Sequence, residues 1–147
     1  MIRVLVSEAA IDVATELDAL ERAGGGAVAT FTGLVRDDDD VEELFLEHYP
    51  DATEKVLGDL AAEAVQRWSL AAATLIHRIG AMKPGERIVF VGTTAVHRAA
   101  ALEACAFLID RLKTDAPFWK RETRGQDARW VGERDSDRDA ADRWKRS

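Results

Sequence analysis

The feature that most constrains the fold is a pair of strand-like segments in the middle of the chain. Residues 73–79 and 87–94 are rich in β-branched and apolar side chains, as strands usually are. The seven residues between them read GAMKPGE. Pro84-Gly85 in this connection is typical of a turn, because proline presets φ and glycine tolerates a positive φ. The two segments are therefore predicted to be strands joined by a turn.

Helices are predicted on both sides of this pair. Apolar residues recur at helical spacing over residues 53–68, which predicts an amphipathic helix. A later helix is expected over about 99–113. Its apolar stripe consists of Leu102, Cys105, Ile109 and Leu112. An earlier helix is expected after Ser7, a suitable N-cap residue, and before the glycines at 24–26. Its apolar face consists of Ile11, Ala14, Leu17 and Leu20.

The remaining strand-like segments complete a mixed order of helices and strands. They are residues 2–6, 27–35, 44–49, 119–123 and 128–131. Segments 27–35 and 44–49 flank an acidic stretch at about 37–43, expected to be a solvated loop, and are candidates for one long hairpin. A charged tail at about 133–147 is expected to hold a short helix fixed by Trp144. Helical crossovers mixed with hairpins favour an α+β domain with a mixed sheet.

Length and composition bound the class of protein. With 147 residues, 47% of them apolar, the chain can bury one core, so a single domain over 1–147 is expected. The only cysteine, Cys105, permits no intrachain disulfide and cannot build a zinc site by itself. No apolar run approaches the roughly 18 residues of a membrane span, and the N-terminus lacks a signal-peptide pattern. A cytoplasmic protein is therefore expected.

Charge is distributed unevenly along the chain. The formal net charge of −7 argues against general nucleic-acid binding, which needs a basic face. Residues 1–119 carry 11 Lys/Arg against 20 Asp/Glu, a net of −9, whereas residues 120–147 carry 9 against 7, a net of +2. An anionic ligand is therefore expected to be met locally, near the C-terminal third.

Three short motifs place cations or histidines at the ends of predicted strands. Arg36 closes FTGLVR, where an arginine is commonly a solvated strand end. His77 in HRIG fits a hydrogen-bonded core histidine better than a catalyst. His97 and Arg98 in VHRAA stand where a strand meets a helix, and the N–H groups of a helix start together with an arginine suit an anion. A simple capping role for His97 is an equal alternative.

A fourth motif, DAPFWKRE, places Lys120 seven residues after Lys113. Pro117 between them ends the helix and reverses the chain, which could bring both ammonium groups to one pocket. Two neighbouring cations lower each other's pKa, and partial burial behind Phe118 and Trp119 would lower it further, so that one lysine could act as a nucleophile or base. The alternative is a pair of ordinary solvated lysines, and Lys113 also suits the C-terminal dipole of its helix.

Taken in order, these motifs belong to longer segments with a specific spacing. The segments are GAVATFTGLVR, LFLEHYP, RWSLAAATLIHRIGAMKPGERIVFVGTTAVHR, FLIDRLKTDAPFWKRE and RWV, which together run through nearly the whole chain. The series resembles the catalytic (large) subunits of molybdopterin synthase, the MoaE family. These enzymes place the dithiolene sulfurs on the pterin of the molybdenum cofactor.

The resemblance implies a fold, a substrate and a partner. The fold would be an α/β-hammerhead domain with a mixed sheet and a small additional antiparallel β subdomain. The partner would be a small ubiquitin-like sulfur carrier with a Gly-Gly thiocarboxylate at its C-terminus, and two copies would flank a homodimer in a heterotetramer. The substrate would be cyclic pyranopterin monophosphate, also called precursor Z. No metal or other cofactor is implied.

The resemblance also implies roles for single residues. Lys120 matches an active-site lysine expected in acid/base chemistry and in contact with the thiocarboxylate. Lys113 matches a second, expected to fix the carrier's last glycine or the substrate. An anion pocket would hold the substrate, with the His-Arg pair donated by the other protomer. Its residues would be Arg36, His97 and Arg98, with Phe31 and Arg121 as weaker candidates for the wall.

Two stretches depart from the commoner family pattern. Four consecutive aspartates, at 37–40, stand where the family more often has a polar loop with Asn and Gly. Ala95-Val96 replaces a frequent Ser-Ala before the His-Arg pair. Neither change removes a residue with an implied role, but so acidic a loop is a poor lid for an anionic substrate and could instead meet a basic patch on the partner.

Two other functions remain open from the sequence. A non-catalytic docking module for a ubiquitin-like protein would keep the fold without the chemistry, although it would have no need of the lysine pair. A Schiff-base enzyme acting on a phosphorylated carbonyl compound would also use lysines beside a phosphate pocket.

Overall fold

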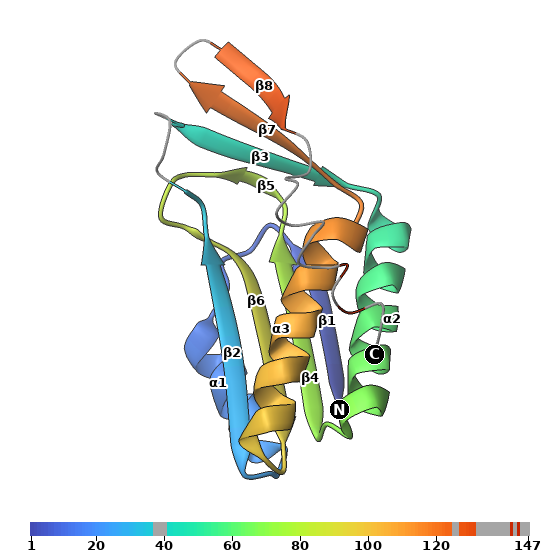
Figure 1. Cartoon of the computed structure of the whole chain (residues 1–147). Helices are drawn as coiled ribbons and strands as arrows, with labels where there is room; N and C mark the ends of the chain where they lie inside the picture. The colour runs from blue at the N-terminus through green and yellow to red at the C-terminus, as the bar shows by residue number, and fades with distance from the viewer. Residues whose placement is uncertain (37–40, 125–126, 132–141, 143, 145–147) are drawn as a thin grey trace.

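Two four-stranded sheets organise the molecule (Figure 1). The computed structural model describes residues 1–36, 41–124, 127–131, 142 and 144. The first sheet, here the mixed sheet, has the order β1 (Ile2–Ser7), β4 (Ala72–Arg78), β6 (Arg87–Ala95) and β2 (Ala27–Leu34). The second, the antiparallel sheet, has the order β5 (Gly80–Met82), β3 (Glu43–His48), β7 (Phe118–Arg124) and β8 (Asp127–Val131). Among the strands of the described residues, β1 and β4 are the one pair that runs parallel.

Three helices cover the mixed sheet from both sides. α2 (Pro50–Trp68) and α3 (Arg98–Asp115) pack together on one face, and α1 (Val13–Arg22) lies on the other (Figure 1). A large apolar core fills the α2–α3 side, and a smaller one, which includes Leu20, Ile76 and Phe90, lies under α1. Among the described residues no helix combines the length and apolarity of a membrane span. The predicted α+β fold with a mixed sheet and an additional antiparallel sheet is confirmed.

The central strand pair is confirmed, with one addition. β4 and β6 pair antiparallel from Ala72 opposite Thr94 to His77 opposite Val89. The connection also contains β5, a strand that the sequence did not predict, and β5 pairs with β3 of the antiparallel sheet. Gly80 begins β5 at a φ of +83°, where a side chain would be strained. The connection therefore joins the two sheets.

The expected hairpin between the segments at 27–35 and 44–49 is wrong. β2 pairs with β6 in the mixed sheet, whereas β3 pairs with β5 and β7 in the other. Along β3, Leu44 and Leu46 are buried while Glu47 is exposed, so one face of this strand closes the core. Burial of that face, rather than nearness in sequence, determines its partners. The acidic stretch between the two strands lies outside the described residues at 37–40.

Two details of the predicted helices are also wrong. α1 is capped by Asp12, whose Oδ1 accepts a hydrogen bond from the Thr15 N–H at 3.2 Å. Ser7 instead accepts from the Ala9 N–H within the preceding turn, because the chain must first pass around the end of the sheet. On α3, Leu102 is 60% exposed. The buried face of α3 is rotated from the predicted stripe and is formed by Ala101, Ala104, Cys105, Phe107, Leu108 and Leu112.

Trp144 is fixed against the helical layer, as predicted. Its Nε1–H donates to Asp110 on α3 at 2.7 Å, and its ring meets those of Trp68 and Phe107 edge to face. The Arg67 guanidinium lies 5.6 Å from the centre of the same ring. Apart from residues 142 and 144, the expected tail helix lies outside the described residues.

We predict opposite effects on stability for two Gly→Ala substitutions. A Cβ at Gly25 would lie 2.6 Å from the carbonyl oxygen of Ala95, so Gly25→Ala should lower the free energy of unfolding by about 1–3 kcal/mol. A Cβ at Gly58, in α2, meets nothing within 4 Å, so Gly58→Ala should raise it by up to about 1 kcal/mol. Urea unfolding measures both, and a neutral Gly25→Ala would contradict the close approach.

Candidate functional site

The two candidate lysines lie on either side of the reversal between α3 and β7. Lys113 is in the last turn of α3 and is exposed, and Lys120 is the third residue of β7 and half-buried. Both charges act on one buried group, His77. The pKa of His77 is lowered to about 3, mainly by burial and in smaller part by the charges of Lys113, Lys120 and His48, while a hydrogen bond to the Arg78 backbone acts in the raising direction. Both lysines therefore lie near enough to His77 for their charges to act on its ring.

The alternation of β7 decides which side chains share a face with Lys120. Phe118 and Lys120 are two residues apart in the strand and therefore point to the same side. Across the ladder, His48 pairs with Phe118 and the buried Leu46 pairs with Lys120. This face of the antiparallel sheet turns toward the core, because Leu46 is only 1% exposed. Lys120 thus extends from an inward face.

Phe118 contacts two histidine rings, and one of them stacks on it. The His77 and Phe118 ring centroids are 4.0 Å apart and the rings are inclined by 26°. The centroid of the His48 ring lies 6.2 Å from that of Phe118. The Nδ1 of His77 is 2.8 Å from the carbonyl oxygen of Arg78. Since a carbonyl can only accept, Nδ1 carries the proton and the neutral ring keeps Nε2 as its acceptor. His77 is the hydrogen-bonded buried histidine that the sequence favoured.

Sequence reasoning missed His48. It ends β3, and its Nδ1 is buried without a hydrogen-bond partner among the described residues. A signal was present, because alternation from Leu44 and Leu46 places His48 on the same inward face. Its contact with Phe118 could not be predicted, because the pairing of β3 with β7 is not evident from the sequence.

Trp119 does not help Phe118 to bury the lysines, although the sequence predicted that both rings would. It lies on the opposite face of β7 from Phe118 and is 40% exposed. Its ring meets Tyr49 edge to face at 4.4 Å. Arg121, one of the weaker candidates, shares that outer face and places its guanidinium 4.9 Å from the centre of the Phe45 ring. Only Phe118 of the Phe-Trp pair is therefore beside the lysines.

Two further candidates, Phe31 and Arg36, lie in β2 and just after it. Arg36 is exposed two residues after the strand ends. Val35 exchanges hydrogen bonds with the turn, donating to Glu86 O and accepting from Gly85 N, each at 2.9 Å. β2 and α3 both run toward the antiparallel sheet, so Arg36 and the lysine pair lie at the same end of the mixed sheet (Figure 1). Phe31 is 38% exposed at the middle of β2, an edge strand.

His97 and Arg98 lie at the opposite end of the mixed sheet. Both are exposed at the start of α3, and His97 occupies the N-cap position without a side-chain capping hydrogen bond. Arg98 and Lys113 are 15 residues apart on this one helix, which corresponds to about 22 Å along its axis. One chain therefore does not bring the His-Arg pair to its own lysines.

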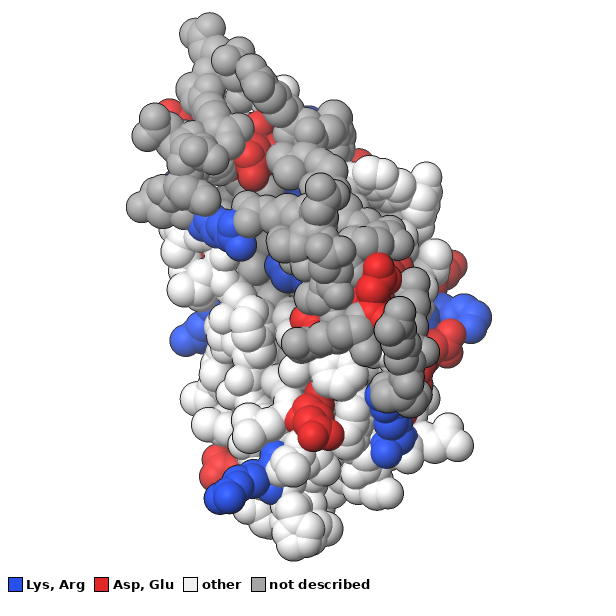
Figure 2. All heavy atoms as spheres, viewed as in Figure 1, with Lys and Arg blue, Asp and Glu red and all other residues white. Residues whose placement is uncertain are grey.

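Other kinds of site are weakly represented among the described residues. These residues contain no group of three or more His, Cys, Asp and Glu side chains placed to hold a metal ion. Cys105 is buried on α3, and burial raises the pKa of its thiol to about 11, so it packs as an apolar side chain. On the face drawn in Figure 2, Lys and Arg side chains are interspersed with Asp and Glu across the described residues.

The buried His77 should make stability depend on pH. The pKa of His77 is about 3 in the folded protein, against an ordinary value of 6.5. Between these two pH values the unfolded chain binds a proton at His77 and the folded chain does not. The contribution of His77 is complete above pH 6.5 and falls as the pH drops toward 3, by up to about 1.4 kcal/mol per pH unit. We predict that His77→Leu flattens this slope.

Urea unfolding between pH 5.5 and 6.5 measures the effect, above the range in which carboxyl groups of lowered pKa such as Glu86 contribute. Ile76→Val, on the neighbouring residue that faces the other core, should keep the wild-type slope. An unchanged slope in His77→Leu would contradict a neutral buried ring.

Comparison with known proteins assigns the chain to a family. The family model described as MoaE protein matches residues 6–115. The molybdopterin synthase catalytic subunit of Pseudomonas aeruginosa is 53% identical over 145 residues, covering 95% of this chain and 97% of that protein. The solved molybdopterin biosynthesis MoaE protein from Burkholderia ambifaria superimposes with a TM-score of 0.85 at 42% identity, covering 98% of each chain.

A more distant structure shares the fold alone. It is described as the protein–protein complex of subunit 1 and 2 of molybdopterin-converting factor from Helicobacter pylori. It superimposes with a TM-score of 0.75 at 21% identity, covering 90% of this chain and 91% of that one. With the family match and the 53% identical relative, the assignment is plain: the chain belongs to the MoaE family of molybdopterin synthase catalytic subunits.

Proposed function

We propose that this chain transfers sulfur from the thiocarboxylated C-terminus of a small ubiquitin-like carrier to cyclic pyranopterin monophosphate, precursor Z. Two successive transfers form the dithiolene of molybdopterin. The observation that supports the proposal is that the charges of Lys113 and Lys120, on either side of the α3–β7 reversal, both act on one buried neutral histidine. Two cations at one place suit an anionic thiocarboxylate and a substrate that carries a phosphate. We expect the reaction in the cytoplasm.

The net reaction defines what the site must supply. Each transfer forms one carbon–sulfur bond on the pterin side chain and cleaves the acyl–sulfur bond of one carrier. Oxygen replaces sulfur on the carrier, which leaves as a carboxylate, so sulfur and oxygen are exchanged and no electrons are gained or lost. Protons must move as the cyclic phosphate opens, and an amine of lowered pKa can carry them. Because the sulfur arrives on the carrier, the buried Cys105 needs no part in it.

The lysines would divide this work. Lys120 extends from an inward strand face beside Leu46, where partial burial favours proton transfer. We assign it to acid/base chemistry and to contact with the thiocarboxylate and the acyl group. Lys113 is exposed at a helix end, and we assign it to fixing the carrier's terminal glycine or the substrate.

The anion pocket would be shared between two chains. Arg36 lies at the same end of the sheet as the lysines, whereas His97 and Arg98 lie at the far end of α3. We propose that a second copy donates its His97 and Arg98 to hold the substrate phosphate and pterin. Phe31, exposed on the edge strand β2, remains a candidate for the wall. Arg121 is a weaker one, because its guanidinium lies over Phe45 on the outer face.

The proposed assembly is a homodimer flanked by two carriers. The complex of subunits 1 and 2 solved for the Helicobacter pylori factor is consistent with such a partner. Native mass spectrometry of this chain, with and without a carrier, would give the stoichiometry directly. A species with two copies of each chain is expected.

A reconstituted reaction tests the function. The purified chain is mixed with a thiocarboxylated carrier and precursor Z, and molybdopterin is measured as product. Carrier that ends in a plain carboxylate is the matched control, and it should give no product. Binding of the carrier without any product from the wild-type chain would identify a docking module instead. Trapping of a substrate imine by borohydride would point to Schiff-base chemistry.

A further inference from the structure

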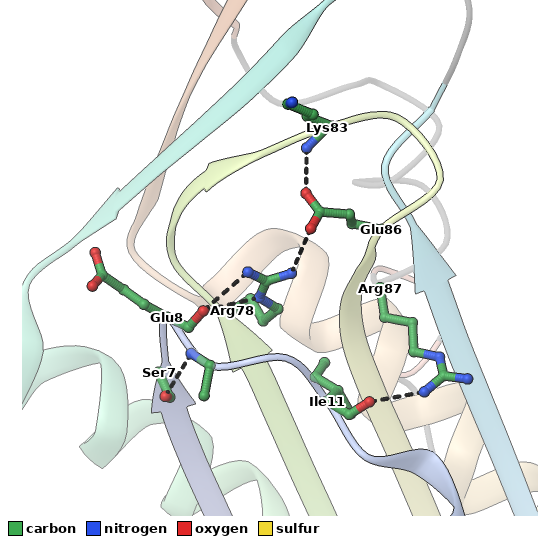
Figure 3. Close-up of polar contacts among 8 residues, drawn as sticks. Ser7, Glu8, Ile11, Arg78, Lys83, Glu86 and Arg87 are labelled. Carbon is green, nitrogen blue, oxygen red and sulfur yellow. Dashed lines mark hydrogen bonds and ion pairs between the residues drawn. The ribbon is translucent and has the colours of Figure 1, made fainter.

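His77 is held rigidly from two sides. Its ring is 5% exposed, and its Nδ1–H donates to the carbonyl oxygen of Arg78 at 2.8 Å. Arg78 is itself anchored, because its guanidinium donates twice to the carbonyl oxygen of Glu8, at 3.0 and 3.3 Å, and lies 3.6 Å from the Glu86 carboxylate (Figure 3). Glu86 in turn accepts a hydrogen bond from the Lys83 N–H. The histidine therefore rests on an anchored strand end.

Phe118 connects this rigid ring to the lysines. It stacks on His77 at 4.0 Å and is the first residue of β7, immediately after Pro117 reverses the chain. Lys120 follows two residues later on the same strand face. Lys113 precedes Phe118 by five residues, at the end of α3. The stack is thus a contact between the mixed sheet and a residue that lies between the two lysines in the sequence.

The charge state of His77 suits a passive support. Burial together with the nearby ammonium groups holds the pKa of the imidazole at about 3, so the ring is neutral wherever the folded protein works. A group that titrates so far below neutral pH is a poor acid or base for a reaction near pH 7. A cationic ring in the same place would repel both lysines.

We propose that His77 is a positioning residue of the sulfur-transfer site. Phe118 stacks on its ring, and this stack sets the position of Lys120 relative to Lys113. The inference rests on the proposed function for its kinetic consequence only. The lysines, not His77, meet the substrate and the carrier. The His77 ring positions Lys120 through its shape, and its Nδ1–H serves only to anchor the ring to the Arg78 carbonyl oxygen.

Kinetics of a double-mutant cycle test the stack. His77→Leu and Phe118→Leu should each lower kcat by about 10- to 100-fold, because a small displacement of a reacting group is costly. KM for precursor Z should change by less than about threefold, since binding groups are kept. The double variant should be no slower than the slower single variant. His77→Phe keeps an aromatic ring that can stack on Phe118, so it should recover most of the rate.

A measurement without turnover keeps the test independent of the proposed function. The chain has five lysines, so the ¹³Cε signals of Lys55, Lys113 and Lys120 can be assigned with Lys55→Arg, Lys113→Arg and Lys120→Arg. In His77→Leu the titration midpoint of Lys120 should shift by more than about 0.3 pH unit, while that of Lys55, paired with Asp59 on α2, should stay unchanged. Failure of the wild-type reaction would leave this readout intact.

A control separates positioning from stability. Ile76→Val alters the neighbouring residue on β4, which packs in the other core with Phe90, and should lower the melting temperature without changing kcat. Loss of stability alone in His77→Leu, with kcat and the Lys120 midpoint as in the wild type, would overturn the proposal. It would also be overturned if His77→Phe were as slow as His77→Leu, because an aromatic ring beside Phe118 would then not be enough to position Lys120.

Discussion

Replacing Lys120 by alanine is expected to reduce kcat for molybdopterin formation by about 10²- to 10⁴-fold. The reason is the position of Lys120 on the inward face of β7, which it shares with Phe118, near enough to His77 for its charge to act on that ring. No other described lysine lies on that strand face. The measurement is single-turnover product formation with thiocarboxylated carrier, so that carrier exchange does not mask the chemical step.

Arginine substitutions separate charge from proton transfer at the two lysines. A guanidinium keeps the positive charge but does not lose its proton in proteins. Lys120→Arg should therefore be almost as slow as Lys120→Ala, whereas Lys113→Arg should keep most of the rate that Lys113→Ala loses. Lys55→Ala, on the exposed side of α2, is the matched control and should be normal. Full activity of Lys120→Ala would refute the proposed function.

Local sequence patterns predict the parts of the fold that local physics determines. The β4–β6 hairpin follows from two apolar segments and Pro84-Gly85, and the helices follow from apolar residues at helical spacing. The three residues of β5 are too few to show any period. The partners of β3 depend on which core its leucines close, and that is decided by segments far away in the sequence. Pairing is therefore where sequence reasoning failed.

The same limit applies to the site. The placement of Lys113 and Lys120 on either side of one reversal was predictable, because a helix end, a proline and a strand stand within eight residues. His48, His77 and Phe118 come from three different strands, and no periodicity within one segment reveals that both histidine rings contact Phe118. His77 could be recognised as a core histidine from its strand. Its contact with the lysines required the fold.

Mixed dimers should recover activity from two inactive variants. Within one chain, Arg98 lies about 22 Å along α3 from Lys113, too far for both to meet one small substrate. If a site uses the lysines of one chain and the His-Arg pair of the other, Arg98→Ala and Lys120→Ala damage different chains of each site. A dimer that contains one of each variant then has one intact site. Random exchange after equal mixing should restore about a quarter of the wild-type sites.

The pairing of variants provides the control. Lys113→Ala mixed with Lys120→Ala should recover nothing, because both lysines belong to the same chain of a site and every mixed dimer lacks one or the other at each position. Recovery must also depend on subunit exchange, so it should appear only after the two proteins are unfolded together and refolded, or coexpressed. Absence of recovery with Arg98→Ala, in dimers shown by native mass to contain both variants, would mean that the His-Arg pair does not cross between chains. The substrate phosphate would then have to be held by groups at the lysine end alone, and Arg36 is the exposed arginine already there.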